Sequence, residues 1–91
     1  MYEIVATNQF SKDYKRCIRR AYSIDLVDEL ILLLSETGTV PQKHKPHPLT
    51  GNLSGYFECH IKPDWLLIWT KSTEDKVITL IATGTHSDLF R

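Results

Sequence analysis

The stretch GYFECHIKPDWLLIWT, residues 55–70, predicts a β-hairpin around which the rest of the chain is arranged. Residues 55–61 are predicted to form one strand, because aromatic and β-branched residues are frequent there. Pro63 and Asp64 then form a tight turn, since proline presets the backbone of the first central turn position. The returning strand covers residues 65–70. Its run WLLIW is apolar throughout, which is typical of a central strand covered on both faces.

Two helices are predicted between a short N-terminal strand, residues 2–6, and this hairpin. Thr7 or Asn8 can cap the first helix with a side-chain oxygen, and Ser23 can cap the second. The second helix ends at Gly38, because glycine readily adopts the left-handed conformation of a helix C-terminus. The first helix carries apolar residues at helical spacing, which predicts a buried stripe: Phe10, Tyr14, Cys17, Ile18 and Ala21.

Residues 39–53 are rich in proline, glycine, lysine and histidine, and are predicted to form a loop. A last strand is predicted over residues 76–83, and Gly84 lets the chain bend before THSDLFR. The order strand, two helices, three strands predicts an α+β fold. Two antiparallel helices should pack on one face of an antiparallel sheet, in a single domain over residues 1–91.

The composition favours one compact domain without a membrane segment. Hydrophobic residues make up 42% of the 91 residues, and no run approaches the roughly 20 apolar residues of a membrane helix. The start, MYEIVATNQF, lacks the regions of a secretion signal, so we expect a cytoplasmic protein. Cys17 and Cys59 belong to no CxxC unit, and we expect two buried reduced thiols.

The charge is balanced overall but unevenly distributed. Eleven basic and eleven acidic side chains cancel, which argues against a strongly basic nucleic-acid-binding domain. The first predicted helix nevertheless has a basic face that can meet a phosphate backbone, although a merely solvated face explains the pattern equally well. The residues of that face are Lys12, Arg16, Arg19 and Arg20.

Residues able to move protons lie just outside the predicted strands. His47 lies in the loop, His60 and Asp64 bracket the turn, and His86 follows the last strand. Strand ends on one rim of a sheet can converge, but periodicity does not tell which strands pair. His44 lies nearby and is expected to be solvated. The histidines lack a CxxC partner or an HExxH helix, so a metal site is not expected.

Three motifs together resemble the YafQ branch of the RelE/ParE toxin superfamily: HPLTGNLSGY (47–56), HIKPDWLLIW (60–69) and GTHSDLF (84–90). The resemblance implies a ribosome-dependent endoribonuclease that needs no cofactor and has a RelE-like fold. It also implies a cognate antitoxin that wraps the toxin in a hetero-oligomer and blocks its site. The family's catalytic positions fall on His47, His60, Asp64 and His86, with Trp65 and Phe90 as supporting residues.

Metal-free RNA cleavage explains these residue types. A base removes the 2′-OH proton, a cationic group stabilises the phosphorane, and an acid protonates the leaving 5′-oxygen, and histidine suits both proton roles near neutral pH. As hypotheses, Asp64 acts with or through His47 on the 2′-OH, His86 is the acid, and His60 holds the phosphate. Positive charge near the phosphate is expected from protonated imidazole together with Lys43, Lys45 or Lys62, and Arg16 and Arg19 are expected to contact the ribosome.

Most of these residues also have an ordinary structural explanation. His47 can be an exposed loop residue, Asp64 a turn former, and Phe90 a residue that packs the C-terminal segment. Trp65 is expected to pack rather than to react, because a large aromatic side chain at the start of an apolar strand normally buries its ring. Phe90 could instead stack on an unpaired base.

Three other functions are compatible with the pattern. A ParE-like toxin shares the fold but inhibits DNA gyrase, and would not need the histidines. A catalytically inactive subunit would bind an antitoxin or act as a repressor, which the balanced charge favours. A metal-dependent hydrolase could use the same histidines, and resistance of the activity to chelators would exclude it.

Overall fold

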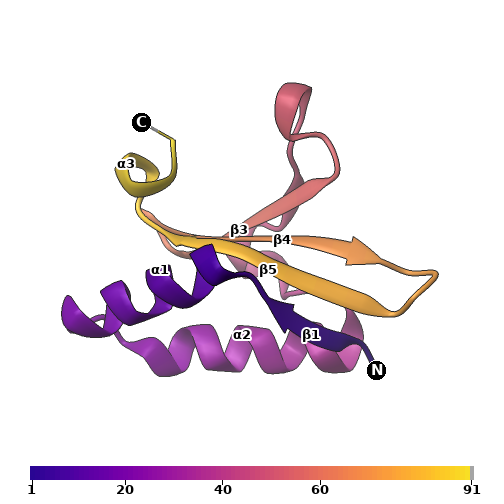
Figure 1. The fold of residues 1–91 in the computed structure, drawn as a ribbon, viewed down its shortest axis with the longest axis horizontal. Coiled ribbons are helices and arrows are strands. Elements are labelled where there is room, and N and C mark those ends of the chain that lie inside the picture. Colours follow the sequence, from indigo (N-terminus) through magenta and orange to yellow (C-terminus); the bar gives the residue numbers. More distant parts are fainter. Residues whose placement is uncertain (91) are drawn as a thin grey trace.

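The computed structural model describes residues 1–90, as a five-stranded sheet with two long helices on one face. Figure 1 shows α1 and α2 side by side beneath the sheet, with α3 on the other side. The elements follow one another in the order β1 (Glu3–Ala6), α1 (Asn8–Arg19), α2 (Ile24–Thr37), η1 (Gln42–His44), β2 (His47–Pro48), η2 (Gly51–Leu53), β3 (Tyr56–Lys62), β4 (Trp65–Ser72), β5 (Val77–Gly84) and α3 (His86–Leu89).

The strands lie in the order β1-β5-β4-β3-β2. Neighbouring strands from β2 to β5 are antiparallel, whereas β1 runs parallel to β5. The α+β class and the two helices on one face are confirmed, but the expectation of a wholly antiparallel sheet is wrong at this edge. The helical hairpin carries the chain across to β2 and β3, so the last strand of the meander returns beside β1 in the same direction.

The hairpin that organises the fold is present as predicted. Strands β3 and β4 pair from Tyr56 opposite Thr70 to Lys62 opposite Trp65, and Pro63 and Asp64 form the turn. The register shifts between His60 and Lys62, next to that turn. Such a bulge re-aims side chains at the end of a hairpin.

The helices begin and end close to the predicted residues. Thr7 caps α1, its Oγ1 accepting a hydrogen bond from the Phe10 amide at 3.0 Å. Ser23 precedes α2 without a side-chain cap bond. Gly38 ends α2 in the left-handed conformation at φ 78°, and a Cβ there would lie 2.5 Å from the Tyr2 ring. A larger residue at position 38 would therefore be both strained and obstructed.

The buried stripe of α1 differs from the prediction at two positions. Phe10 and Cys17 are buried as expected, but Ile18 is 51% exposed and Ala21 is also exposed. Asp13 is fully buried in the stripe instead. Phe10, Asp13 and Cys17 are spaced so that they lie on one face of the helix. The predicted direction of the buried face was therefore correct, but the assumption that every buried position is apolar was wrong.

The two faces of the sheet have different roles. Side chains of β3 and β4 that point toward the helices, such as Cys59 and Leu67, belong to the main core. Full burial of an aliphatic side chain such as Leu67 stabilises the fold by about 1.5–3 kcal/mol. The alternate residues point to the opposite face, because successive strand residues alternate. On that face a groove lies between η2 and α3, lined by residues that include Leu53, Ile68 and Phe90.

The segment 39–53 is less irregular than predicted. His47 and Pro48 form a short edge strand, β2, and two single 3₁₀ turns, η1 and η2, flank it. The two cysteines are buried and unpaired, which confirms the prediction of reduced thiols. Burial raises the pKa of Cys59 to about 12. None of the helices within residues 1–90 is long and apolar enough to cross a membrane.

Candidate active site

Three histidines from three different elements lie in a row on the face of the sheet opposite α1 and α2. The rings of His47 and His60 have centroids 6.4 Å apart, and those of His60 and His86 are 6.1 Å apart. Phe90 continues the row, with its ring centroid 6.3 Å from that of His86. The row joins β2, β3 and α3, so residues almost 40 positions apart in the sequence meet in one site.

Each histidine of the row uses its Nδ1 atom to hold the ring in place. His47 Nδ1 lies 2.8 Å from the Lys45 carbonyl oxygen, and His60 Nδ1 lies 3.2 Å from the Pro63 carbonyl oxygen. His86 Nδ1 lies 2.7 Å from Asp64 Oδ1. Because carbonyl oxygens and an ionised carboxylate only accept hydrogen bonds, each Nδ1 must carry the proton. Nε2 is therefore the ring nitrogen that remains for chemistry in all three residues.

Asp64 is the partner of His86. Its Oδ1 accepts hydrogen bonds from both the backbone N–H of His86, at 3.0 Å, and the ring Nδ1. These bonds, the backbone one first and the side-chain one second, lower the pKa of Asp64 below its ordinary value. The hypothesis that Asp64 acts with or through His47 does not match this geometry, since Asp64 contacts His86. The arrangement fixes the tautomer of His86 and holds the orientation of its ring.

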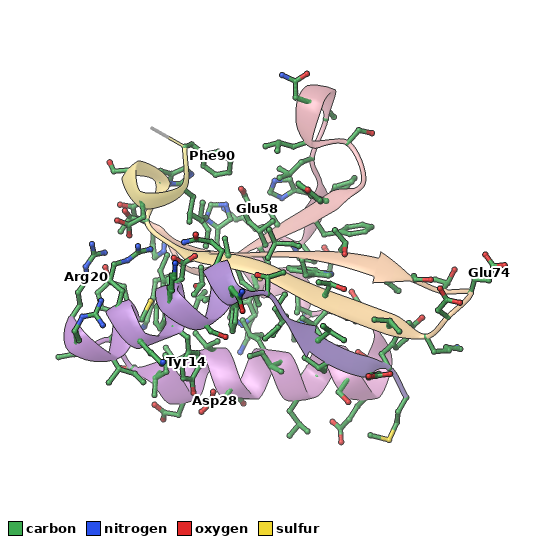
Figure 2. The ribbon with its side chains drawn as sticks, viewed as in Figure 1. Tyr14, Arg20, Asp28, Glu58, Glu74 and Phe90 are labelled. Atoms are coloured by element: carbon green, nitrogen blue, oxygen red, sulfur yellow. The ribbon has the colours of Figure 1, made fainter. Side chains whose placement is uncertain are left out.

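Glu58 is a site residue that the sequence analysis missed. Its side chain is only 8% exposed, and its Oε1 lies 3.4 Å from His47 Nε2 and 4.0 Å from His60 Nε2. Figure 2 labels Glu58 on the side of the sheet that faces Phe90, away from α1 and α2. A signal was present in the sequence, because Glu58 precedes His60 by two residues in a predicted strand and must share its face.

The three lysines of the prediction lie beside the histidine row. A hollow next to His60 is lined by residues that include Lys43, Lys45 and Lys62. The expectation that His44 is only solvated is wrong, because this residue is half-buried and its Nδ1 lies 2.9 Å from the His60 carbonyl oxygen. His44 therefore helps to hold the backbone of the histidine row.

Trp65 and Phe90 differ in burial. Trp65 is 4% exposed, donates from Nε1 to Thr83 Oγ1 at 3.0 Å, and packs edge-on against Tyr22 with ring centroids 4.8 Å apart. This burial is the one expected of a packing residue. Phe90 is 42% exposed at the end of the histidine row, where its ring is accessible to a nucleobase.

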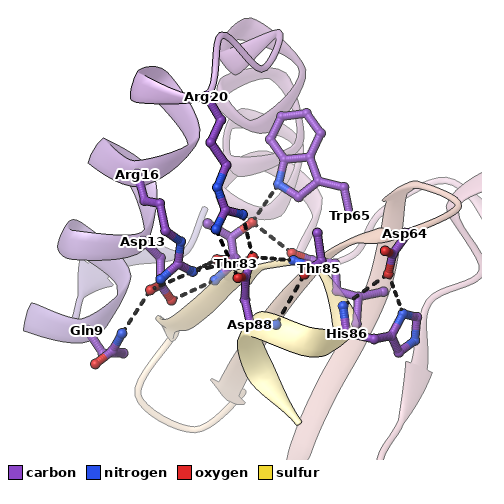
Figure 3. Close-up of polar contacts among 11 residues, drawn as sticks. Gln9, Asp13, Arg16, Arg20, Asp64, Trp65, Thr83, Thr85, His86 and Asp88 are labelled. Atoms are coloured by element: carbon purple, nitrogen blue, oxygen red, sulfur yellow. Dashed lines mark hydrogen bonds and ion pairs between the residues drawn. The ribbon is translucent and has the colours of Figure 1, made fainter. Parts of the chain in front are cut away.

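An ionic network behind α3 fixes the backbone from which His86 projects (Figure 3). Arg20, the residue that caps the C-terminus of α1, makes two hydrogen bonds to the carboxylate of Asp88, at 2.7 and 3.1 Å. Asp88 also accepts from the Thr85 amide, and Thr85 Oγ1 accepts from the Asp88 amide, which completes a capping box. Arg20, followed by these bonds, holds the pKa of Asp88 far below its usual range.

Asp13 extends this network into the core. It accepts hydrogen bonds from Gln9 at 2.8 Å and from the Thr83 amide at 3.1 Å, and it pairs with Arg16 at 3.1 Å. Arg16 also contacts the Thr83 carbonyl at 3.3 Å. The guanidinium of Arg16 is thus engaged within the fold, whereas Arg19 remains exposed on the same helix. Asp13 and Asp88 appeared in the sequence as ordinary surface charges.

Within residues 1–90, no three His, Cys, Asp or Glu side chains come close enough together to hold a metal ion. What the row offers is acid–base chemistry: three imidazoles with exposed or half-exposed rings, two carboxylates beside them, and lysines at the edge. Such a set can remove one proton, supply another, and stabilise negative charge between them.

Comparisons with known proteins agree on one family. The model of the YafQ family, described as a bacterial toxin of type II toxin-antitoxin systems, matches residues 2–91. The mRNA interferase toxin YafQ of Escherichia coli strain K12 is 37% identical over 89 residues, which cover 97% of this chain and 95% of that protein.

Solved structures agree in the fold as well. The crystal structure of the E. coli DinJ-YafQ complex contains a chain that is 36% identical, with full coverage of both chains and a TM-score of 0.87. A YoeB/ParE toxin from Agrobacterium tumefaciens, at 24% identity, covers 92% of this chain and 98% of its own, with a TM-score of 0.79. That more distant likeness shows the α+β fold alone.

Proposed function

This chain belongs to the YafQ family of bacterial type II toxins, and we propose that it cuts messenger RNA on the translating ribosome with its row of histidines. It is an endoribonuclease of the mRNA interferase type and the toxin of a toxin-antitoxin pair. The family match favours this activity over inhibition of DNA gyrase. We further propose that residues 1–91 act as one domain, in the cytoplasm, where translating ribosomes are found.

The observation that carries the catalytic assignment is the 2.7 Å contact between His86 Nδ1 and Asp64 Oδ1. This contact fixes the ring of His86 through Nδ1 and leaves Nε2 available to exchange a proton with substrate. A group with these properties is suited to protonate the 5′-oxygen that leaves when the RNA chain breaks. The lowered pKa of Asp64 makes it a weak base near neutral pH, so Asp64 orients His86 and is not the base.

The base belongs on the other side of the phosphorus, because the attacking 2′-oxygen and the leaving 5′-oxygen lie roughly in line. His60 is the neighbouring imidazole in the row, and its Nε2 is available to take the 2′-OH proton. The 2′-oxygen then bonds to phosphorus, the bond from phosphorus to the 5′-oxygen breaks, and His86 supplies the proton to that oxygen. The products are a 2′,3′-cyclic phosphate and a free 5′-hydroxyl.

Charge on the phosphate is balanced by His47 together with Lys43, Lys45 and Lys62, which lie beside His60. Preorganised cations of this kind act most strongly on the charge that develops in the transition state. Phe90, exposed at the far end of the row, stacks on an unpaired base of the messenger RNA. This completes a site that needs no cofactor.

The protein partner is a cognate antitoxin. The related E. coli YafQ was solved together with DinJ, which supports a hetero-oligomer in which an antitoxin covers the toxin. Ribosomal RNA is the second partner, and the exposed basic residues Lys12, Lys15 and Arg19 of α1 supply phosphate contacts for it.

Primer extension on a messenger RNA, with and without programmed ribosomes, tests this function. Wild-type protein should give discrete cuts that require the ribosome, and His86→Ala should abolish them. Glu74→Ala is the control, because Glu74 lies exposed in the turn at the far end of the β4–β5 hairpin (Figure 2). A wild-type protein that gives no cuts would instead support the inactive antitoxin-binding subunit. Cuts that persist in His86→Ala would refute the assigned acid.

A further inference from the structure

Glu58 lies beneath two of the catalytic imidazoles, and the backbone dictates this position. Strand β2 pairs with β3 so that His47 stands directly opposite Glu58, and paired residues of antiparallel strands project to the same face. His60 follows Glu58 by two residues on β3, so it also shares that face. One carboxylate is thereby brought to within 4.0 Å of Nε2 in both rings.

The geometry of this cluster favours a proton between Glu58 and His47. His47 and His60 both donate from Nδ1 to carbonyl oxygens, so in a neutral ring Nε2 would present a lone pair to the carboxylate. Two lone pairs at 3.4 Å repel each other, whereas a proton between them makes the contact attractive. A carboxylate with 8% exposure also needs a compensating charge, because burying an unpaired charge is costly.

We propose that Glu58 is a positioning residue that holds His47 in the imidazolium form and prepares His60 to accept a proton. The shared proton resides on His47, because an imidazole is ordinarily a stronger base than a carboxylate. The shorter distance, 3.4 Å to His47 against 4.0 Å to His60, favours His47 as the ion-pair partner of Glu58. We call His47, Glu58 and His60 the Glu58 cluster.

The charges facing Glu58 are consistent with this role. Strand β2 contributes His47 and β3 contributes His60, while the residue paired with Glu58 on β4 is the apolar Ile68. His86 of α3 lies beyond His60 and is already paired with Asp64. With one proton the Glu58 cluster is neutral overall. It becomes positive when His60 takes the 2′-OH proton, at the moment when negative charge on the phosphorane is greatest.

The effect of Glu58 on the reaction rests on the proposed cleavage activity, but the charge of His47 can be measured in a protein that cuts no RNA. Glu58→Gln keeps the size and the hydrogen-bonding capacity of the side chain and removes its charge, and Glu58→Asp keeps the charge. Glu74→Gln is the matched control at an exposed turn. Melting curves of the three variants establish that each is folded.

The first readout is the ¹⁵N NMR spectrum of the imidazoles near neutral pH. In the wild-type protein and in Glu58→Asp, both ring nitrogens of His47 should carry protons, whereas in Glu58→Gln Nε2 should be unprotonated. Glu74→Gln should match the wild type. A His47 ring with the same protonation in the wild type and in Glu58→Gln would overturn the proposal, whether or not the protein cuts RNA.

The second readout is the cleavage rate on programmed ribosomes. Glu58→Gln should lower the rate at saturating ribosome concentration roughly tenfold to a hundredfold, the scale of losing one preorganised charge, with little change in apparent affinity. Glu58→Asp should recover part of the rate. In a His47→Gln background the further loss from Glu58→Gln should shrink, because coupled residues are not additive. Full additivity, or a loss of affinity without loss of rate, would contradict the assigned role.

The two readouts separate the two claims. An inactive wild-type protein with a Glu58-dependent charge on His47 would reject the proposed function and keep the charge assignment. An active protein in which Glu58→Gln changes neither the spectrum nor the rate would keep the function and reject the role of Glu58.

Discussion

The two ends of the histidine row are held in opposite ways. His86 stands on α3 with its ring largely exposed, and its carboxylate partner Asp64 is 67% exposed. His47 stands on a two-residue edge strand, but its carboxylate partner Glu58 is only 8% exposed. The end proposed to deliver a proton is thus open to solvent, while the end proposed to carry charge lies next to a buried carboxylate.

The supports behind the two ends differ as well. α3 is tied to α1 by the bidentate pair of Arg20 and Asp88, and it is capped by Thr85. β2 has backbone pairing with β3 and a bond from His47 to the Lys45 carbonyl. General acid catalysis needs accurate placement of one atom, whereas charge stabilisation acts over several ångströms. The ionic network thus supports His86, the proposed acid, whereas the buried Glu58 lies beside His47, the proposed cation.

The largest expected effect falls on the acid itself. His86→Ala should lower the single-turnover rate of ribosome-dependent cleavage by about a hundredfold or more, the scale of losing a general acid. The free His86→Ala protein should melt like the free wild type, because the ring is exposed. A variant that keeps more than a third of the wild-type rate would show that the exposed end of the row is not the acid.

The next effect separates orientation from proton transfer. Asp64→Asn keeps the size of the side chain but can flip and donate where the carboxylate accepts, so the ring of His86 loses its fixed tautomer. We expect a rate about tenfold to a hundredfold below wild type, less than for His86→Ala. The double variant should be no slower than His86→Ala alone. A double variant that is much slower would mean that Asp64 also acts on the substrate directly.

A smaller effect comes from the ionic support of α3. Arg20→Gln removes the bidentate pair with Asp88 and should lower the cleavage rate several-fold, because misplacing a reacting group costs rate without removing it. Glu74→Gln, at the exposed turn between β4 and β5, is the control. An unchanged rate in Arg20→Gln would mean that the Thr85 cap alone positions His86.

The pair of Arg20 and Asp88 should also make the stability of α3 depend on pH. The pKa of Asp88 is lowered in the folded state, so its contribution to stability is fully present above the ordinary carboxyl value. That contribution is lost as the pH falls from there through the folded-state value. NMR signals of α3 should therefore persist below pH 4 in the wild type and change at higher pH in Arg20→Gln. Coincident transitions in the two proteins would contradict this linkage.

The sequence predicted the fold class, the hairpin and the residues of the histidine row, because these depend on local patterns. Turn chemistry at Pro63 and Asp64, the cap at Thr7 and the stop at Gly38 all act within a few residues. Convergence of the row is different, since it depends on which strands pair. The parallel pairing of β1 with β5 has no local signal and was not predicted.

The burial of the Asp13 and Glu58 carboxylates could not be predicted from sequence patterns. Asp13 is buried at a core position of α1, and Glu58 is buried beneath the histidine row. From the sequence alone, both acidic residues would be expected on the surface. A carboxylate can be buried only where partners satisfy it, and those partners come from distant parts of the chain. Thr83 is 70 positions from Asp13, so periodicity along one helix could not reveal the contact.

The smallest effect should come from the exposed basic face of α1, away from both ends of the row. Arg16 is engaged with the buried Asp13, and reversing its charge would set two carboxylates against each other and damage the fold. Arg19 is exposed, so Arg19→Glu should leave melting and the saturated cleavage rate unchanged while weakening ribosome binding several-fold.

Because each phosphate contact releases about one counterion, Arg19→Glu should also flatten the dependence of ribosome affinity on salt. Arg19→Lys is the matched control and should keep the wild-type salt dependence. If affinity and salt slope are the same in Arg19→Glu and Arg19→Lys, the basic face of α1 is a solvated surface, and ribosome binding depends on the lysines beside His60. If they differ, binding and catalysis are carried by separate faces of the toxin, and each can be altered without the other.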